Sequence, residues 1–313
     1  MKVLFVSSGN SGYGIIPFIK SQGESLINNG IDVVFFTIEG KGFSGYLKNI
    51  FRLRKYLKKN NFDIVHAHYS LSSFVASLAS LGMGIPVITS LMGSDSKVNT
   101  AGIFLIKFFN RFFWDRLIVK SPSMKDDLKL INAIVVPNGV DFTVFKPVDR
   151  NYAKEIAGFD MAKKTVSFIA DPKRYSKNYD LAMKAFSLVK YEDVELKVSY
   201  NISPAKMVYY INASDVVLLT SRWEGSPNII KEALACNVPI VSTDVGDVNE
   251  LLAGVKGCFI VTNSPEDIAG KIEKALDYND RTNGRDRIKH LEINSVAKKI
   301  IDIYKNALNY EKR

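Results

Sequence analysis

Two glutamates with seven residues between them are the side chains of this sequence that most directly suggest chemistry. They are Glu224 and Glu232 of "RWEGSPNIIKEA", and a Ser-Pro pair lies between them. Ser226 can act as a helix N-cap, and Pro227 suits the first position of a helix. This places Glu224 in a loop and Glu232 in the second turn. Because helical side chains lean toward the N-terminus of their helix, both carboxylates are predicted to face one ligand.

The pattern suits the binding of hydroxyl groups and of an anion. Ionised carboxylates accept hydrogen bonds and donate none, so two of them suit a ligand rich in hydroxyls, such as a sugar and a ribose. The backbone N–H groups from Gly225 to Asn228 would lie at the positive end of the helix dipole, which favours an anion or a hydroxyl oxygen. For Glu232 taken alone, a solvated helix acid is the competing interpretation.

The elements that must position these residues alternate regularly along the chain. Short apolar runs predict strands, and the segments between them have helical periodicity. Strands are expected at residues 2–8, 32–38, 63–68, 86–92, 116–121 and 133–138, and then at 164–170, 194–200, 215–221, 239–244 and 257–261. Strands that are apolar almost throughout and separated by helices indicate an α/β fold with parallel sheets covered on both faces.

The alternation of strands and helices is interrupted once and then begins again, which predicts two doubly wound domains in this chain of 313 residues. The segment 146–164 is polar and poorly patterned, so we place the linker there, between an N-terminal domain at 1–150 and a C-terminal domain at 151–294. The last segment, 295–313, has apolar residues on one helical face and is expected to pack back on the N-terminal domain. In open α/β sheets ligands gather at the carboxyl ends of the strands, and the glutamate pair follows such an end.

A longer tract around the glutamates, "SDVVLLTSRWEGSPNIIKEALACNVPIVSTDVGDVNEL", closely resembles the signature region of glycosyltransferase family four. The segments "FDIVHAHYS", "VITSLMGSD", "VVPNGVDFTVFKP" and "FIADPKRYSKNYDLAMKAF" extend the resemblance over most of the chain. It implies a GT-B architecture, two Rossmann-like domains facing a cleft, with the acceptor bound by the N-terminal domain and a nucleotide sugar by the C-terminal one. Such enzymes transfer the sugar with retention of anomeric configuration. By resemblance, Glu224 would contact hydroxyls of the transferred sugar and Glu232 the nucleotide ribose.

The resemblance also implies two cations that neutralise the donor diphosphate. One of them maps onto Lys177. The other, an arginine, normally stands five or six positions earlier, where this chain has Asp171 and Pro172, so Arg174 is the nearest substitute and Lys173 another. Such cations stabilise the negative charge that develops on the leaving diphosphate. We therefore expect no metal and no other cofactor.

The loop "SSGNSGYGI" near the N-terminus is less specific. Glycines let backbone amides approach a phosphate, and the family's glycine at this place matches Gly12 or Gly14. A dinucleotide site with Glu39 as its ribose acid is the alternative. The glycines are spaced GxxGxG, however, and not GxGxxG.

Three further residues are assigned to the acceptor side by resemblance. His66 and His68 share one face of a strand; a metal would need a third ligand, so we expect one structural histidine and one, His68, near the acceptor. Asp95 belongs to the same side. Many relatives carry a histidine where this chain has Met92, and methionine cannot exchange a proton. Either Asp95 or a substrate phosphate supplies the missing function, or the protein is a catalytically silent member that binds a sugar nucleotide or a partner.

The net charge of +10 lies mostly in the first half, which carries +8 of it. Cations alternate with aromatic or aliphatic residues in "YLKNIFRLRKYLKKNNFD" and "FLIKFFNRFFWDR". These segments fit either helices resting on an anionic membrane surface or core-facing helices with a basic rim. No nucleic-acid module accompanies the charge, so nucleic acid is not expected as a partner.

These observations lead to one functional expectation. The protein is predicted to move a hexose-type sugar from a UDP, GDP or ADP donor to a glycan or lipid-linked acceptor in surface polysaccharide assembly. No apolar run is long enough to span a bilayer, so we expect a cytoplasmic protein that is peripheral on the inner face of the cell membrane.

Overall fold

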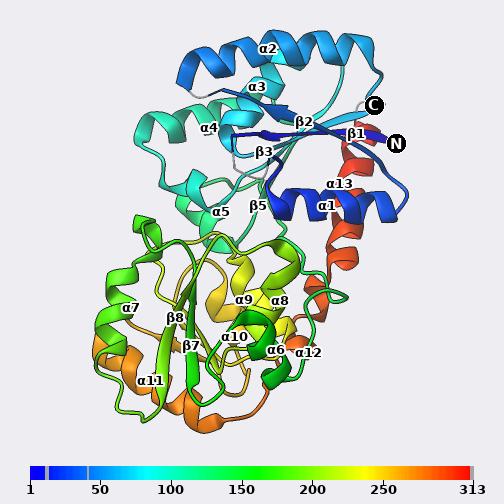
Figure 1. Ribbon diagram of the computed structural model, residues 1–313. Coiled ribbons are helices and arrows are strands. Elements are labelled where there is room, and N and C mark those ends of the chain that lie inside the picture. Colours follow the sequence, from blue (N-terminus) through cyan, green and yellow to red (C-terminus); the bar gives the residue numbers. More distant parts are fainter. Residues whose placement is uncertain (11–13, 41, 311–313) are drawn as a thin grey trace. The chain divides into compact units, whose positions relative to one another are not determined.

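The chain divides into two units, each built on its own parallel β-sheet (Figure 1). The computed structural model describes residues 1–10, 14–40 and 42–310. Unit 1 comprises Met1–Gly139 and Ile293–Arg313, and unit 2 comprises Val140–Glu292. The sequence pattern predicts boundaries at 150 and 294, whereas the structure divides the chain at 139 and 292.

The first boundary falls earlier because residues 140–150 pack with unit 2. Val140 is buried in a hydrophobic cluster of unit 2, and its backbone pairs with Glu292 at the other end of that unit. Arg285 donates hydrogen bonds to the carbonyl oxygens of Phe142 and Phe145, at 2.8 and 2.6 Å. The segment that follows the last strand of unit 1 is therefore held by unit 2.

The sheet of unit 1 has six parallel strands in the order β2-β1-β3-β4-β5-β6. The strands are β1 (Lys2–Ser8), β2 (Asp32–Ile38), β3 (Ile64–His68), β4 (Val87–Ser90), β5 (Arg116–Val119) and β6 (Ile134–Val135). Most of their side chains are buried, as expected of a parallel sheet covered on both faces.

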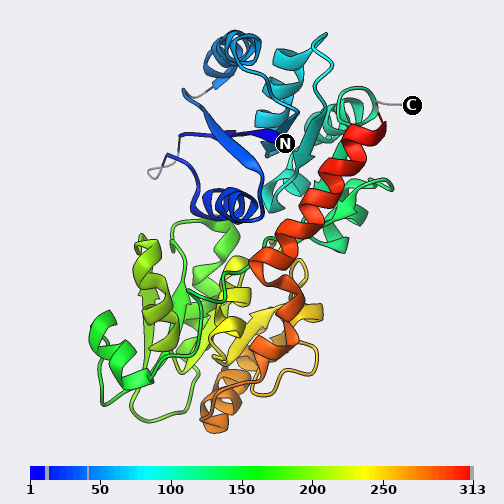
Figure 2. The ribbon, with the colours of Figure 1, turned by 90° about the vertical axis from the view of Figure 1, so that its right-hand side faces the viewer.

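Helices cover both faces of this sheet. One face carries α2 (Gly42–Lys59), α3 (Ser70–Ser80), α4 (Thr100–Phe112) and α5 (Pro122–Leu128), whose apolar side chains join one core cluster. The other face carries α1 (Pro17–Asn28) and α13 (Ile293–Tyr310), the red helix of Figure 2. The final helix thus packs in unit 1, where its apolar side contributes Val296, Ile300 and Tyr304 to the core.

The sheet of unit 2 has five parallel strands in the order β11-β10-β9-β7-β8. They are β7 (Lys164–Ile169), β8 (Val194–Ser199), β9 (Val216–Leu219), β10 (Ile240–Thr243) and β11 (Phe259–Val261). One face is covered by α7 (Tyr179–Phe186) and α11 (Pro265–Tyr278). The other is covered by α8 (Pro204–Asn212), α9 (Asn228–Ala235) and α10 (Val248–Leu252), with α12 (Gly284–Arg287) packed on α9. The prediction of two doubly wound parallel sheets is confirmed.

The segment assigned to a linker contains a helix, α6 (Arg150–Ala157), which the sequence analysis missed. Asp149 caps its first turn by accepting a hydrogen bond from the Tyr152 N–H, and Gly158 ends it in the left-handed conformation. This helix has too few apolar residues to show a helical periodicity in the sequence. Its polar side chains are instead used in an ion-pair network.

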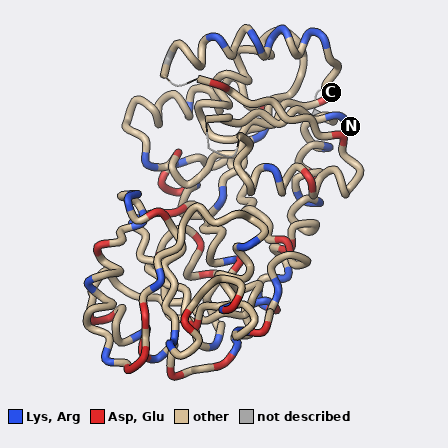
Figure 3. The backbone as a smooth tube through the Cα atoms, viewed as in Figure 1, with Lys and Arg blue, Asp and Glu red and all other residues tan. Residues whose placement is uncertain are grey.

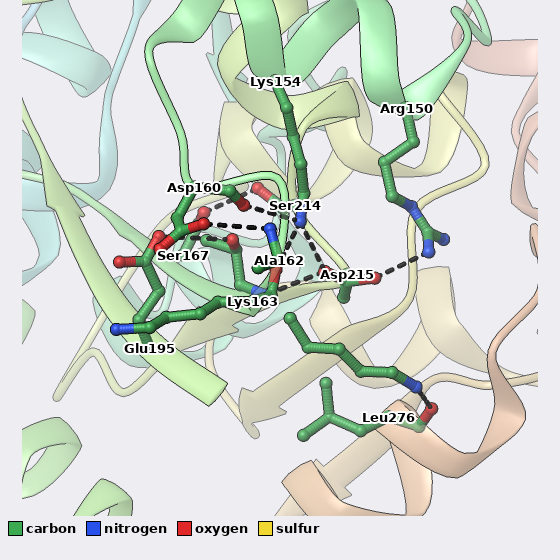
Figure 4. Close-up of polar contacts among 12 residues, drawn as sticks. Arg150, Lys154, Asp160, Ala162, Lys163, Ser167, Glu195, Ser214, Asp215 and Leu276 are labelled. Atoms are coloured by element: carbon green, nitrogen blue, oxygen red, sulfur yellow. Dashed lines mark hydrogen bonds and ion pairs between the residues drawn. The ribbon is translucent and has the colours of Figure 1, made fainter. Parts of the chain in front are cut away.

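That network centres on Asp215, a buried carboxylate just before β9 (Figure 4). Arg150 donates to it at 2.6 Å, and Lys154, one turn further along α6, lies 3.8 Å away. The Thr165 backbone N–H donates to the same carboxylate at 2.7 Å. Lys154 is itself buried and also donates to the Asp160 carbonyl oxygen. Asp215 therefore joins α6 to β7 and pairs with two cations.

We predict that Asp215→Asn lowers the free energy of unfolding of unit 2 by about 3–5 kcal/mol, because it leaves the buried Lys154 ammonium without a counter-charge. Urea unfolding of wild type and variant measures this difference. Asp286→Asn is the matched control in the same unit, since it breaks only the exposed pair between Asp286 and Lys289. Equal unfolding midpoints for the Asp215 variant and the wild type would contradict the prediction.

Two histidines form part of the core of unit 1. His66 Nδ1 lies 2.6 Å from the Tyr304 hydroxyl of α13, and its Nε2 lies 2.8 Å from Ser90 Oγ. His68 Nε2 is hydrogen-bonded to Gln22 Oε1 of α1 at 3.0 Å. Burial lowers the pKa of His66 to about 3 and that of His68 well below its usual value, with smaller contributions from neighbouring positive charges. Both imidazoles are therefore neutral in the folded protein at neutral pH.

These two pKa values predict that the protein loses stability in mild acid. The folded pKa of each histidine is depressed, so its contribution is fully present above the unfolded value of about 6.5 and is lost as the pH falls below it. The free energy of unfolding should drop by up to about 1.4 kcal/mol per pH unit for each histidine. His66→Gln should reduce this slope, measured by urea unfolding between about pH 7.5 and pH 5.5. The exposed His290 provides the control, and a wild-type slope of zero would refute the account.

Candidate active site

An ion pair between Lys177 and Glu224 lies at the carboxyl edge of the sheet of unit 2. Lys177 ends the short 3-10 turn Tyr175–Lys177 that follows β7, and Glu224 lies in the loop after β9. Lys177 Nζ is 2.5 Å from Glu224 Oε1, and Ser221 Oγ donates to the same oxygen at 2.8 Å. The two charged side chains are 14 % and 18 % exposed, so each keeps a small surface for a ligand.

The two loops that carry this pair are also joined through their backbones. The Arg222 N–H donates to the Ser176 carbonyl oxygen at 2.8 Å. Thr220 Oγ1 lies 3.2 and 3.1 Å from the carbonyl oxygens of Lys177 and Asn178. Because β7 and β9 are neighbours in the sheet, residues 47 positions apart in sequence are brought into contact.

Glu232 lies in the second turn of α9, as the sequence predicted. Burial raises the pKa of its carboxyl group to about 7, and the adjacent positive charge of Lys231 opposes the shift. The side chain retains some exposed surface although protein surrounds most of the carboxyl group. Among the hydrogen bonds of the described residues, none ends on the Glu232 carboxyl oxygens. Glu232 thus stays a candidate for hydrogen bonding with a ligand.

The start of α9 differs from the prediction. The helix begins at Asn228, so Pro227 is the N-cap residue and not the first helical position. Ser226 does not cap the helix through its side chain; its hydroxyl lies 2.6 Å from Asp247 Oδ2. The hydroxyl donates to the buried Asp247 carboxylate and accepts from the Lys231 ammonium, so its oxygen is used away from the helix N-terminus. The sequence pattern could not show it, because Asp247 is far along the chain.

Beneath this loop lies a buried cluster that the sequence analysis missed. Lys231 is fully buried, and its ammonium donates to Ser226 Oγ at 2.9 Å. Burial lowers the pKa of Lys231 to about 8, while the charges of Asp247 and Glu232 act in the opposite direction. One signal could have found it: a lysine on the face of α9 that otherwise carries Ile230 and Leu234 must be paired when buried. The cluster holds Ser226 in place.

A close backbone approach fixes the same loop from the other side. Gly246 has a φ of +66°, and a Cβ atom built there would lie 2.5 Å from the Gly225 carbonyl oxygen. Only glycine at position 246 allows this contact. Gly225 is buried, so the loop that carries Glu224 is supported by protein on its inner side.

A hollow of about 450 Å³ opens beside the ion pair at the carboxyl ends of β9, β10 and β11. It is lined mostly by polar residues: Ser221, Arg222, Thr243, Asp244, Thr262, Asn263 and Asp267, with Val245, Ile260 and Val261. Ser221 links the hollow to Glu224 through its hydrogen bond. Arg222, which the sequence analysis did not single out, is exposed, and its guanidinium lies over the ring of Tyr175.

The remaining predicted cations do not join the ion pair. Lys173 and Arg174 are exposed and immediately precede the turn that ends at Lys177. No ion pair or hydrogen bond among residues 14–40 and 42–310 connects either side chain with Glu224. Both are positioned on the same loop as Lys177 and stay candidates for contact with a phosphate.

The predicted acceptor residues of unit 1 are largely buried. Met92 and Asp95 are each 4 % exposed, and His68 has no exposed surface. Asp95 accepts hydrogen bonds from the Met92 N–H at 2.7 Å and from the hydroxyl and N–H of Ser70 at 2.7 and 3.1 Å. It therefore fixes the turn after β4 and the start of α3. Contact of these side chains with an acceptor would require the residues that cover them to move.

The predicted glycine loop is only partly described. Gly14 has a φ of +67°, a conformation that favours glycine. Gly12 lies outside the described residues. Across the described part of the chain, no group of three His, Cys, Asp or Glu side chains could hold a metal ion. No helix there is long and apolar enough to cross a membrane.

Comparison with known proteins links both units to enzymes that transfer sugars. The model of glycosyltransferase family 4 matches residues 18–144, and the model of glycosyl transferases group 1 matches residues 197–278. An uncharacterized glycosyltransferase of Methanocaldococcus jannaschii is 28 % identical over 76 % of this chain and 73 % of its own length. The UDP-Gal:alpha-D-GlcNAc-diphosphoundecaprenol alpha-1,3-galactosyltransferase of Escherichia coli is 24 % identical over 69 % of this chain, which spans 66 % of that relative.

Solved structures show the same architecture. Sucrose-phosphate synthase from Thermosynechococcus elongatus matches with a TM-score of 0.83 at 16 % identity, covering 99 % of this chain and 100 % of that one. HepE of Anabaena in complex with UDP and glucose matches with a TM-score of 0.80 at 15 % identity, covering 98 % and 100 %. The two family matches, which fall one in each unit, and these shared folds lead to one assignment: the chain belongs to glycosyltransferase family 4 and has the GT-B fold.

Proposed function

We propose that this protein is a retaining glycosyltransferase that moves a hexose-type sugar from a nucleotide-diphosphate donor to a glycan or lipid-linked acceptor. The observation that carries the proposal is the ion pair of Lys177 and Glu224, partly buried at the carboxyl ends of two adjacent strands. A cation and a carboxylate in contact there match the two halves of a sugar diphosphate, one anionic and one rich in hydroxyls.

The proposed roles follow from the charge that moves during the reaction. When the bond between the anomeric carbon and the diphosphate breaks, negative charge accumulates on the leaving group, and the Lys177 ammonium stabilises it more in the transition state than in the ground state. Glu224 accepts hydrogen bonds from hydroxyls of the sugar. Their ion pair holds both groups at this edge of the sheet before the donor arrives.

The other site residues complete the donor site in this proposal. Glu232 binds the ribose hydroxyls, and the backbone N–H groups of Gly225, Ser226 and Asn228 bind sugar or phosphate oxygens. Arg174 or Lys173 supplies the second positive charge toward the diphosphate. The proposed reaction uses these cations and no metal or other cofactor.

The class of acceptor and the cellular role are proposed from the relatives. The Escherichia coli relative is named for a UDP-Gal donor and a diphosphoundecaprenol-linked acceptor, and HepE is described with UDP and glucose. A UDP, GDP or ADP sugar is accordingly proposed as the donor, surface polysaccharide assembly as the role, and the inner face of the cell membrane as the place of action.

A catalytically silent member of the family is the second candidate, and Met92 favours it. Its side chain is buried and offers neither a proton nor a hydrogen-bond donor where many relatives have histidine. Release of nucleoside diphosphate from a panel of nucleotide sugars by the purified protein would exclude this candidate. Binding of a nucleotide sugar with no turnover in the presence of lipid-linked acceptors would favour it.

We predict that Glu224→Gln lowers kcat/KM for the donor by about 10²–10³-fold, because it removes the charged partner of both Lys177 and the sugar hydroxyls. Nucleoside diphosphate release, followed with the donor that the panel identifies, measures the loss. Glu155→Gln, a change of the same chemistry at an exposed position of α6, should keep wild-type turnover. Wild-type turnover by the Glu224 variant would rule out the proposed mechanism.

The pKa of Glu232 predicts that donor affinity depends on pH near neutrality. The raised pKa of about 7 means that the carboxyl group is protonated below this pH and becomes a pure acceptor above it. Affinity for the intact nucleotide sugar should therefore rise severalfold between about pH 6 and pH 8. Calorimetric titration of wild type and Glu232→Gln tests this, with a flatter profile expected for the variant. Identical profiles would remove Glu232 from the donor site.

A further inference from the structure

Helix α4 of unit 1 exposes three phenylalanines on successive turns. Phe104 and Phe112 are 67 % and 66 % exposed, and Phe108, between them, is 42 % exposed. The rings of Phe108 and Phe112 lie with their centroids 5.1 Å apart. The opposite side of the helix anchors it to the unit, because Ile106 and Phe109 are buried in the core. The exposed rings are thus additional to those that stabilise the fold.

The charged residues of α4 lie along one edge of these rings. At 100° per residue, the exposed arc begins with Lys107 and Arg111, continues through the three phenylalanines and ends at Leu105, which is 44 % exposed. We call these six residues the α4 face: Phe104, Leu105, Lys107, Phe108, Arg111 and Phe112. The helix contains no Asp or Glu. The α4 face therefore has an apolar centre and a positively charged edge.

The neighbouring helices on the same face of the sheet also expose apolar or positively charged residues. Helix α3 packs between α2 and α4, with its Phe74 ring 4.5 Å from that of Phe109. It has no charged residue and exposes Leu71 and Leu78. Helix α2 has six Lys and Arg residues and no acid (Figure 3). It also exposes Phe51. Arg52 pairs with Glu39 of the preceding loop, whereas Lys48, Lys55, Lys58 and Lys59 are exposed.

We propose that the α4 face docks unit 1 on an anionic lipid surface, with the three phenylalanines inserted between the lipids and the cations of α4 and α2 at the headgroups. A helix in this position lies in the plane of the interface, with its apolar side about 5–10 Å deep in the headgroup and acyl boundary. Each lysine or arginine near the surface adds attraction to anionic lipids, which salt screens.

The charges favour lipid over a second copy of the chain as the occupant. Lysine is depleted in the buried core of protein interfaces, where an ammonium loses its water. Here eight cations and no acid lie on α2 and α4, so two copies meeting through this surface would bring like charges together. A bilayer with anionic headgroups offers the complementary charge over the whole surface, together with an apolar phase for the rings.

This inference rests on the proposed function for its biological meaning, because an enzyme with a lipid-linked acceptor must reach the bilayer that holds it. Its physical basis is independent of the donor site. The α4 face belongs to unit 1, whereas Lys177, Glu224 and Glu232 belong to unit 2.

The test measures binding of the full chain to sedimented vesicles of phosphatidylcholine with about 30 % phosphatidylglycerol, and to vesicles of phosphatidylcholine alone. One variant, Phe104→Ser/Phe112→Ser, removes the two most exposed rings. A second, Lys107→Gln/Arg111→Gln, removes the charged edge. The matched control, Met161→Ser/Leu188→Ser, changes two exposed apolar residues of unit 2. Thermal unfolding of each variant confirms that the exposed changes leave the fold intact.

Wild-type protein is expected to bind the anionic vesicles and to be released by salt. The phenylalanine variant should lose about tenfold or more in partitioning, the charge variant about fivefold per cation on anionic vesicles only, and the control nothing. In a Phe108→Trp variant, brominated lipids should quench the fluorescence of the new indole, which reports insertion directly.

Three results would overturn the proposal: no binding by wild type, equal binding by wild type and both α4 variants, or loss of a dimer in the phenylalanine variant with vesicle binding unchanged. The last would assign the α4 face to a second copy of the chain. Donor turnover in solution, measured in parallel, separates this inference from the proposed function. Turnover without vesicle binding removes the docking surface alone, and vesicle binding without turnover removes the enzymatic function alone.

Discussion

The contact between Lys177 and Glu224 is the constraint on which the proposed donor site depends. Lys177 ends a three-residue 3-10 turn and Glu224 lies in a loop. Both are brought together because β7 and β9 are hydrogen-bonded neighbours and end at the same edge of the sheet. The bond from the Arg222 N–H to the Ser176 carbonyl oxygen keeps the two loops at a constant separation. The placement of cation and carboxylate is therefore a direct consequence of strand order.

Buried charged residues stabilise the loop that carries Glu224. The Lys231 ammonium, the Ser226 hydroxyl and the Asp247 carboxylate form a chain of contacts under the loop that follows Glu224. Burying these groups is costly unless they are paired, and they resist separation because a lone charge in the interior is unfavourable. Asp215 is likewise a buried charge that is paired, and its ion pairs join α6 to the residue before β9. Paired charges thus hold neighbouring segments of unit 2 together at both ends of its strands.

Much of the fold and part of the site could be predicted from sequence. Apolar runs located every strand, and the placement of Glu232 in the second turn of α9 followed from the Ser-Pro pattern. Helix α6 was not predicted because it is held by an ion pair between Arg150 and Asp215, 65 positions further along the chain. No local sequence pattern shows such a contact. The role of Ser226 was wrong for the same reason: its hydroxyl is bound by Asp247. Polar contacts between residues far apart in the sequence cannot be predicted from hydrophobic periodicity.

The most direct test of the account is a crystal structure of the protein with an intact nucleotide sugar. The account predicts that the diphosphate lies within hydrogen-bond distance of Lys177 Nζ, that a sugar hydroxyl donates to the Glu224 carboxylate, and that the ribose contacts Glu232. The 2.5 Å contact between Lys177 and Glu224 should lengthen as each group turns to the donor. A nucleotide sugar bound elsewhere on unit 2, with this ion pair unchanged, would contradict the account.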